Sequence, residues 1–161
     1  MSWTLHRIDD RLIHGQVLVA WGGRLSPARM WIADDAVAAS DWERQLFLDA
    51  APGIEVRVVP VAEAAAAHAA EAVAPGGAFL LVRDLASARR LVEAGAKVAT
   101  LNVGGIHYAP GRQKVHDYVY LDDADRANAR ALLAAGVRLE VQDVPASKPQ
   151  SLEGLDPALR S

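Results

Sequence analysis

The organisation of this chain follows from one stretch, Arg7-Ile8-Asp9-Asp10-Arg11-Leu12-Ile13-His14-Gly15-Gln16-Val17. Residues 3–8 alternate in polarity, which predicts a first strand, and residues 15–21 carry apolar side chains at helical spacing. The stretch therefore joins a strand to a helix. Such a junction in an α/β domain points backbone N–H groups and the positive end of the helix dipole at a bound anion. A histidine there can attack phosphorus, because neutral imidazole is abundant near neutral pH.

Composition narrows the class of protein. The chain has 161 residues, enough for one domain with a substantial core, and 52% of them are hydrophobic. A net charge of −3 argues against nucleic-acid binding, which would need a basic face. The absence of cysteine excludes disulfides and thiolate metal sites. No apolar run is long enough to span a membrane, and residues 1–4 lack a signal-peptide pattern. We therefore expect a cytoplasmic domain that is not inserted in a membrane.

Strands and helices alternate along the rest of the chain. The expected strands are 3–8, 29–33, 54–59, 78–82, 98–103, 118–121 and 137–144. The expected helices are 15–21, ended by Gly22-Gly23, then 41–50, 61–73, 85–93 and 122–135. This alternation predicts an α/β fold, a three-layer α/β/α arrangement around an open, mainly parallel twisted sheet of about six to seven strands. Residues 147–161 are polar, contain two prolines and are expected to form a loosely packed tail.

The polar loops of this predicted sheet converge at one edge. Ligands of open α/β sheets bind beyond the carboxyl ends of the strands. The loops expected there are 9–15, 34–35 and 102–111. Because the first strand is short and apolar, it should be central, which would place His14 at this edge and open to solvent. In such a shallow site, Leu12 and Ile13 would supply docking surface and exclude water.

The charged residues before His14 each allow two interpretations. His14 is either a nucleophile or a helix-capping residue. Arg11 either binds a phosphoryl group through forked hydrogen bonds or pairs with an aspartate. Asp9 and Asp10 would repel a phosphate, so they fit better as acceptors that fix the loop or orient the imidazole. Arg7, at the end of the strand, is expected in a structural ion pair.

Other polar residues are weaker candidates. Gly15 would permit close backbone approach to an oxyanion, and Gln16 either donates an N–H to it or simply begins the helix. Asn102, Gly104 and Gly105 either line the site or form a plain turn.

The remaining histidines have lesser expected roles. His107 can approach the site from its glycine-rich loop, whereas His6 and His68 are expected to be structural or solvent-facing, and His116 has no assigned role. No H-x-x-x-H spacing and no G-x-G-x-x-G occurs, so neither a metal nor a dinucleotide is expected.

The first segment resembles the active-site segment of IIB subunits of the mannose/fructose/sorbose class of the bacterial phosphoenolpyruvate-dependent sugar phosphotransferase system. Weaker matches follow in the right order as far as about Pro145: residues 34–35 with 37–38, 91–95, 102–105, 119–121, Asp125 and 136–137. The resemblance implies a IIB domain over 1–146 followed by a tail over 147–161. It also implies that His14 carries a phosphoryl group, on Nδ1, with Arg11 beside it.

The resemblance further implies partners and a location. A IIA phosphohistidine on a separate polypeptide would donate the phosphoryl group to His14, and a sugar held by a membrane IIC/IID complex would receive it. No cofactor is implied, and the protein would be cytoplasmic, associated peripherally with the permease. Two alternatives stay open. One is a regulatory phosphoprotein of the same fold, and the other is a small-molecule phosphate-binding or hydrolytic α/β domain.

Overall fold

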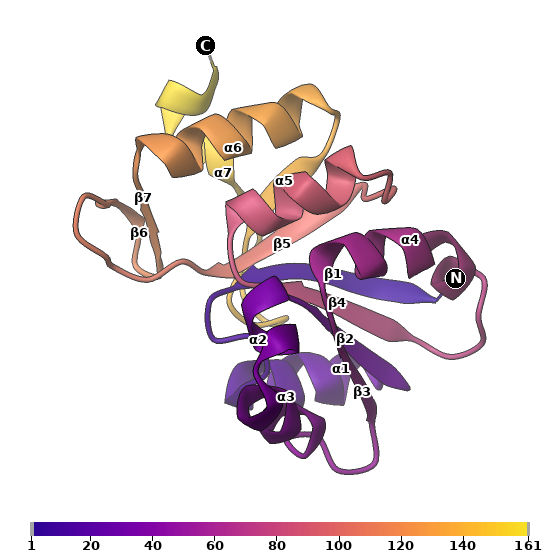
Figure 1. Ribbon diagram of the computed structural model, residues 1–161. Coiled ribbons are helices and arrows are strands. Elements are labelled where there is room, and N and C mark those ends of the chain that lie inside the picture. The colour runs from indigo at the N-terminus through magenta and orange to yellow at the C-terminus, as the bar shows by residue number, and fades with distance from the viewer. Residues whose placement is uncertain (1, 161) are drawn as a thin grey trace.

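A seven-stranded sheet with helices on both faces forms the centre of the computed structural model, which describes residues 2–160 (Figure 1). The strand order is β3-β2-β4-β1-β5-β8-β9, and every neighbouring pair is parallel except β8 and β9. The strands of this sheet are β1 (Trp3–Asp9), β2 (Arg29–Ala33), β3 (Glu55–Val59), β4 (Ala78–Val82), β5 (Thr100–Gly105), β8 (Arg138–Val141) and β9 (Gln150–Ser151). The expected α/β class and mainly parallel sheet are therefore confirmed.

The helices divide between the two faces of the sheet. Figure 1 shows α4, α5 and α6 on one face and α1 and α3 on the other. Their bounds are α1 (Gly22–Leu25), α2 (Asp35–Ala39), α3 (Asp41–Leu48), α4 (Val61–Ala72), α5 (Leu85–Glu93), α6 (Asp123–Ala134) and α7 (Leu152–Leu155). A π-helical segment, η1 (Gln16–Trp21), precedes α1, and a 3-10 turn, η2 (Pro157–Arg160), follows α7. The strands β6 (Gln113–His116) and β7 (Val119–Leu121) form a separate antiparallel hairpin.

The first strand is central, as expected, because β1 pairs with β4 on one side and β5 on the other. Side chains of a strand alternate between the two faces of its sheet. Ile8 accordingly packs in the cluster beneath α4, α5 and α6, while Leu5 packs in the opposite cluster beneath η1 and α3. The sequence of β1 thus anchors both halves of the core, and its carboxyl end holds the loop to His14 rigidly.

The first helix does not end at Gly22-Gly23. It runs on as α1 and ends at Ser26, whose φ is 46°. Glycine in a helix interior costs only about 1 kcal/mol, and the buried side chains of Val17 and Trp21 hold this helix against the sheet. Packing therefore outweighs the local preference of two glycines.

The expectation of a loosely packed tail at 147–161 is also wrong for the part that the structure describes. β9 pairs with β8, and Leu152 and Leu159 are only 0% and 4% exposed. Arg126 Nε lies 2.8 Å from Asp156 Oδ2. Two well-spaced leucines and one ion pair fix this segment, although its composition is typical of a loop. Two short elements, α2 and β6, were likewise not expected.

Gly104 provides a test of the packing at the centre of the sheet. A Cβ at this position would overlap the Arg7 guanidinium. We expect Gly104→Ala to lower the free energy of unfolding by about 3 kcal/mol, since overpacking a rigid core forces neighbours to shift. Gly23→Ala is the control, because its Cβ would meet nothing within 4 Å, and its effect should stay within about 1 kcal/mol. Urea unfolding measures both, and a Gly104→Ala protein as stable as the parent would contradict the packing described.

Candidate functional site

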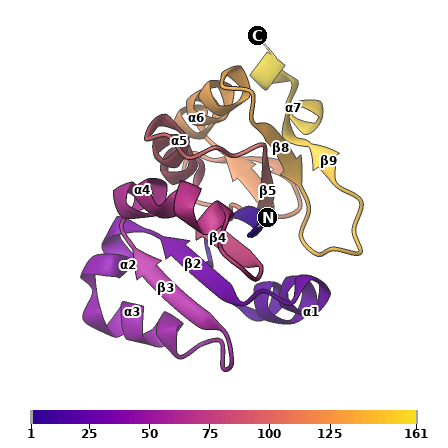
Figure 2. The ribbon, with the colours of Figure 1, turned by 90° about the vertical axis from the view of Figure 1, so that its right-hand side faces the viewer.

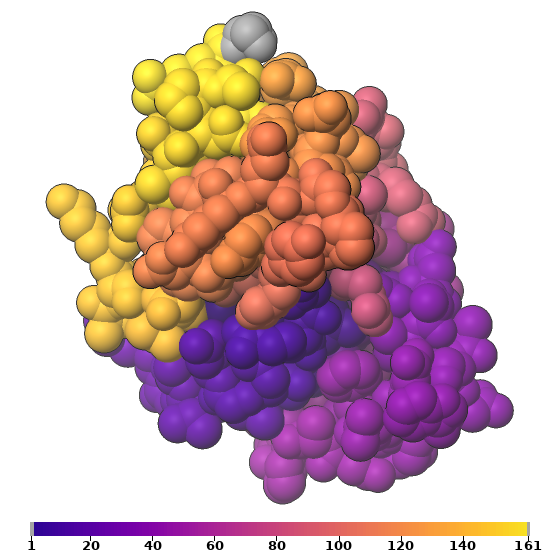
Figure 3. Space-filling view, turned by 90° about the vertical axis from the view of Figure 1, so that its left-hand side faces the viewer, coloured from indigo at the N-terminus to yellow at the C-terminus, as the bar shows by residue number. Residues whose placement is uncertain are grey.

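The candidate site lies where β1 ends. Figure 3 looks at the carboxyl edge of the sheet, where the indigo N-terminal part of the surface lies directly beneath the orange segment that contains the β6–β7 hairpin. The loop that follows β1 and the loop that follows β5 meet here, since Asp9 pairs with Gly105 and the backbone N–H of Asp10 donates to Gly105 O at 3.0 Å. Segments about a hundred residues apart in the sequence are thus brought together.

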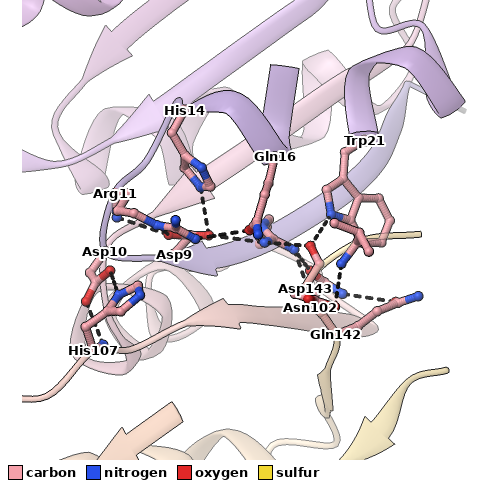
Figure 4. A network of polar contacts seen from close by, with 12 residues as sticks. Asp9, Asp10, Arg11, His14, Gln16, Trp21, Asn102, His107, Gln142 and Asp143 are labelled. Carbon is pink, nitrogen blue, oxygen red and sulfur yellow. Dashed lines mark hydrogen bonds and ion pairs between the residues drawn. The ribbon is translucent and has the colours of Figure 1, made fainter. Parts of the chain in front are cut away.

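His14 is tied to the end of β1 by its imidazole. Nε2 of His14 lies 2.9 Å from Oδ2 of Asp9 (Figure 4). The Asp9 side chain is 0% exposed, whereas that of His14 keeps 15% of its exposure. The carboxylate therefore fixes the orientation of the ring from below, and the other ring nitrogen, Nδ1, is left out of this contact.

Asp9 also forms an ion pair with a buried arginine. Nη2 of Arg7, whose side chain is 0% exposed, lies 3.1 Å from Asp9 Oδ2. This is the structural ion pair that the sequence predicted for Arg7. Burial raises the pKa of Asp9, but the hydrogen bonds from His14 and the Arg11 backbone, with the charge of Arg7, outweigh it and lower this pKa to about 2. Burial also lowers the pKa of Arg7, an effect that the charge of Asp9 opposes. Asp9 is accordingly a carboxylate at neutral pH.

The Arg7 guanidinium is bonded on several sides. It donates to the backbone carbonyls of Gln142 at 3.1 Å and Asp143 at 3.0 Å, and to Oδ1 of Asn102. Its Cζ lies 5.5 Å from the centre of the Trp21 ring. A buried cation is stable only with such a set of partners, so these residues hold Arg7, and through it Asp9, in place.

The sequence left open whether Arg11 pairs with an aspartate or is free to bind a phosphoryl group, and the structure shows where its side chain lies. Its backbone N–H donates to Asp9 Oδ1 at 3.1 Å, and its Nε lies 3.4 Å from the same oxygen. Its Nη2 donates to Oε1 of Gln16 at 3.0 Å. The Arg11 side chain is 43% exposed. In this structure it pairs with Asp9, and its exposed guanidinium has room to turn toward a bound anion.

Asp10 links the site to the loop after β5. It accepts hydrogen bonds from the backbone N–H of His107 at 2.8 Å and pairs with His107 Nδ1 at 2.6 Å (Figure 4). A Cβ at Gly105 would lie 3.1 Å from His107 Cε1 and 3.3 Å from Asp9 Oδ1. Glycine at this position therefore allows the two loops to approach, and Asp10 fixes the loop rather than the imidazole of His14.

The expected docking role of Leu12 and Ile13 is wrong. Leu12 is 1% exposed and Ile13 is 6% exposed, and both pack in the core cluster with Val17. Leu12 has a φ of 57°, a left-handed conformation that costs a side-chain-bearing residue about 1–2 kcal/mol. Burial of the two apolar side chains offsets that strain, so these residues anchor the loop. Gly15 is exposed, and a Cβ there would meet nothing within 4 Å, which leaves open space beside His14.

The other candidates from the second loop lie behind the site. Asn102 bonds to Arg7 and, through Nδ2, to Oε1 of Gln142 at 3.2 Å, and Gly104 packs against Arg7. The carbonyls of Gln142 and Asp143 escaped the sequence analysis, because a backbone acceptor leaves no mark on residue type. Trp21 escaped it too, since its spacing marks it only as a core residue of a helix.

Across residues 2–160 no group of three or more His, Cys, Asp or Glu is arranged so that it could hold a metal ion. Between Ser2 and Arg160 the helices are all too short or too polar to cross a membrane.

Comparison with known proteins identifies the family. A family model described as "PTS system sorbose subfamily IIB component" matches residues 3–158. The sorbose-specific EIIB component of Klebsiella pneumoniae is 37% identical over 150 residues, which cover 92% of this chain and 91% of that protein. The mannose-specific EIIAB component of Escherichia coli (strain K12) is 36% identical over 141 residues, which cover 87% of this chain but only 44% of that relative. The chain thus spans less than half the length of this second relative.

A solved structure agrees with these matches. The crystal structure of the IIBSor domain of the sorbose permease from Klebsiella pneumoniae superimposes with a TM-score of 0.89 at 33% identity, covering 98% of both chains. With a family model over residues 3–158 and a relative of 37% identity over nearly its whole length, the chain belongs to the sorbose subfamily of IIB components of the phosphotransferase system, within its mannose/fructose/sorbose class.

Proposed function

We propose that this protein is a phosphocarrier for sugar uptake. His14 accepts a phosphoryl group from a phosphohistidine of a IIA protein and passes it to a sugar held by a membrane IIC/IID complex, on whose cytoplasmic side the protein works. Membership of the IIB family supports this role. The observation that carries the proposal is the 2.9 Å contact between His14 Nε2 and the buried Asp9 carboxylate.

That contact supports one of the two ring nitrogens as the nucleophile. Asp9, with a pKa of about 2, is ionised at neutral pH and can only accept a hydrogen bond. The proton of neutral His14 therefore sits on Nε2, as assigned from the hydrogen-bond network. The lone pair is then on Nδ1, which supports Nδ1 as the nucleophile.

The same contact supports both steps, the transfer of the phosphoryl group to His14 and its transfer from His14 to the sugar. As Nδ1 forms its bond to phosphorus, the N–P bond of the donor breaks and its electron pair returns to the donor imidazole. His14 keeps its Nε2 proton, so its ring becomes cationic, and the Asp9 carboxylate neutralises that charge. In the second transfer the sugar hydroxyl oxygen bonds to phosphorus, its proton goes to the surrounding water, and the N–P electron pair returns to Nδ1. A ring that leaves as neutral imidazole is a good leaving group.

The residues around His14 complete the proposed site. Arg11, now paired with Asp9 and Gln16, would turn its exposed guanidinium to the phosphoryl oxygens, since forked charge-assisted bonds suit a phosphate. The open space at Gly15 would admit the phosphoryl group. Asp10 and Gly105 would hold the neighbouring loop. Phosphoryl transfer needs chiefly positioning and charge neutralisation, which these residues supply without a cofactor.

His14 should be the sole phosphorylated residue. Incubation with the general phosphotransferase proteins, a IIA protein and phosphoenolpyruvate should give a label that is acid-labile and base-stable, as a phosphohistidine is. His14→Ala should abolish the label, and His107→Ala, whose imidazole contacts Asp10 but not Asp9, should keep it. Label retained in His14→Ala would refute the assignment, and no label from any IIA donor would favour a domain that merely binds phosphate.

Arg11 should accelerate the transfer. A charge-assisted hydrogen bond contributes about 1.5–3 kcal/mol, so Arg11→Ala should slow phosphorylation of His14 roughly tenfold or more. Arg11→Lys keeps the positive charge but loses the forked hydrogen bonds, so its transfer rate should lie between those of the parent and of Arg11→Ala. Arg44→Ala is the matched control, because Arg44 is 45% exposed and pairs with its helical neighbour Asp41, away from Asp9. A normal transfer rate in Arg11→Ala would make Arg11 a structural partner of Asp9 only.

The ionised state of Asp9 has its own test in the pH dependence of stability. Because the pKa of Asp9 is about 2 in the folded protein and about 3.9 in an unfolded chain, its stabilising contribution is complete above about pH 4 and is lost as the pH falls through about 2. The parent should therefore lose about 2 kcal/mol more unfolding free energy than Asp9→Asn over that window. Urea unfolding at a series of pH values measures this, and parallel curves for the two proteins would contradict it.

A further inference from the structure

A cavity of about 650 Å³ lies at the amino edge of the sheet, opposite His14. The pairing of β1 with β5 begins at Arg7 and Asn102, so residues 3–6 of β1 lie outside that pairing. Figure 2 looks at this side, with the amino end of β1 between β4 and β5. Small side chains keep the space unfilled: Ala65, Ala69 and Ala72 of α4, with Gly95 and Ala99 before β5. The volume is in the range of small-molecule pockets.

The lining of the cavity combines apolar surfaces with hydrogen-bonding groups. Trp3, Leu5 and Trp21 supply apolar surface alongside the alanines. The strands β5 and β8 and the residues next to them supply hydrogen-bonding side chains: Lys97, Thr100, Asn102, Glu140 and Gln142. An occupant must therefore be apolar on its faces and rich in hydrogen-bonding groups at its rim.

The lining carries no net charge. Its formal charges are one ammonium, on Lys97, and one carboxylate, on Glu140. Two imidazoles also line it, His6 and His68, whose Nε2 atoms lie 2.9 Å apart. Burial, and then the neighbouring His68, lower the pKa of His6 to about 4, and burial lowers that of His68. Both rings are neutral at pH 7, so the cavity has no excess of cations to hold a phosphate or a carboxylate.

We propose that this cavity binds an uncharged ring compound bearing several hydroxyl groups, a monosaccharide without a phosphate. The C–H faces of such a ring pack on aromatic and aliphatic side chains, as Trp and Leu provide here. Its hydroxyl groups both donate and accept, which matches the ammonium of Lys97, the hydroxyl of Thr100 and the carboxylate of Glu140. The amides of Asn102 and Gln142 shape the wall, since they already bond to each other and to other groups of the protein. A phosphorylated sugar would bring a charge that the lining does not neutralise.

A ligand in this cavity would be connected through side-chain contacts to His14 at the other edge of the sheet. Asn102 and Trp21 line the cavity and also contact Arg7. Arg7 in turn holds Asp9, which holds His14. A bound sugar would thus contact the residues that fix the phosphoryl-transfer loop. Only this coupling rests on the proposed function, because the binding itself needs no phosphate donor.

Fluorine NMR of protein labelled with 5-fluorotryptophan tests the binding directly. Trp3 and Trp21 line the cavity, whereas Trp42 lies on α3, is 70% exposed and serves as the internal reference. Titration with unphosphorylated sorbose, mannose, fructose or N-acetylgalactosamine should shift the Trp3 and Trp21 resonances saturably and leave Trp42 unmoved. Mannose 6-phosphate and indole should bind at least tenfold more weakly than the best sugar.

Two pairs of variants locate the site. Ala69→Trp should fill the cavity and weaken sugar binding at least tenfold, whereas Ala70→Trp, an exposed neighbour on α4 outside the lining, should leave binding unchanged. Ala99→Phe fills the cavity from the residue that precedes β5 and should repeat the loss if Ala69→Trp does not fold. The proposal is overturned if no sugar gives a saturable shift, if the filled variants bind as the parent does, or if mannose 6-phosphate or indole binds as tightly as the best sugar.

Discussion

The buried pair of Arg7 and Asp9 is the interaction on which the rest of this structure depends. Both side chains are 0% exposed, and they lie at the end of the central strand. Breaking a buried pair by removing one partner costs about 3–5 kcal/mol, because the remaining charge is left without a counterion. The chain meets this constraint with backbone carbonyls from the segment after β8, an amide from β5 and a glycine that leaves room for the guanidinium. Segments from three strands are therefore committed to positioning one carboxylate.

In the proposed function, that commitment would allow a single histidine to serve as both acceptor and donor of a phosphoryl group. A flexible carboxylate near His14 would repel the incoming phosphate. Asp9 instead has both oxygens occupied, Oδ2 by Arg7 and His14 and Oδ1 by Arg11. These fixed donors neutralise its negative charge. In the proposed function, Asp9 would therefore orient the imidazole and stabilise the cationic ring without repelling the phosphoryl group. Leu12 and Ile13 are buried in the core and anchor the loop that carries His14.

The sequence predicted the parts of this arrangement that depend on local pattern. Alternating strands and helices predicted the parallel sheet, and the short apolar first strand predicted its central place. Arg7 was expected in an ion pair, which the structure shows. The failures arise where packing overrides local preference. Gly22 and Gly23 do not stop a helix that is anchored by Val17 and Trp21, and a polar tail docks through Leu152 and Leu159. The burial of Leu12 and Ile13 depends on a left-handed turn that no residue type in the loop signals.

The hydrogen bond that holds His14 in place also limits how accessible its side chain is. Its side chain is only 15% exposed, although in the proposed function a phosphoryl donor carried by another protein would have to reach it. Nε2 is bonded to a fully buried carboxylate, and the next residue, Gly15, has open space where a side chain would stand. Because the contact with Asp9 engages Nε2, it leaves Nδ1 as the nitrogen that phosphorus would approach in the proposed function, and it restricts the direction of that approach.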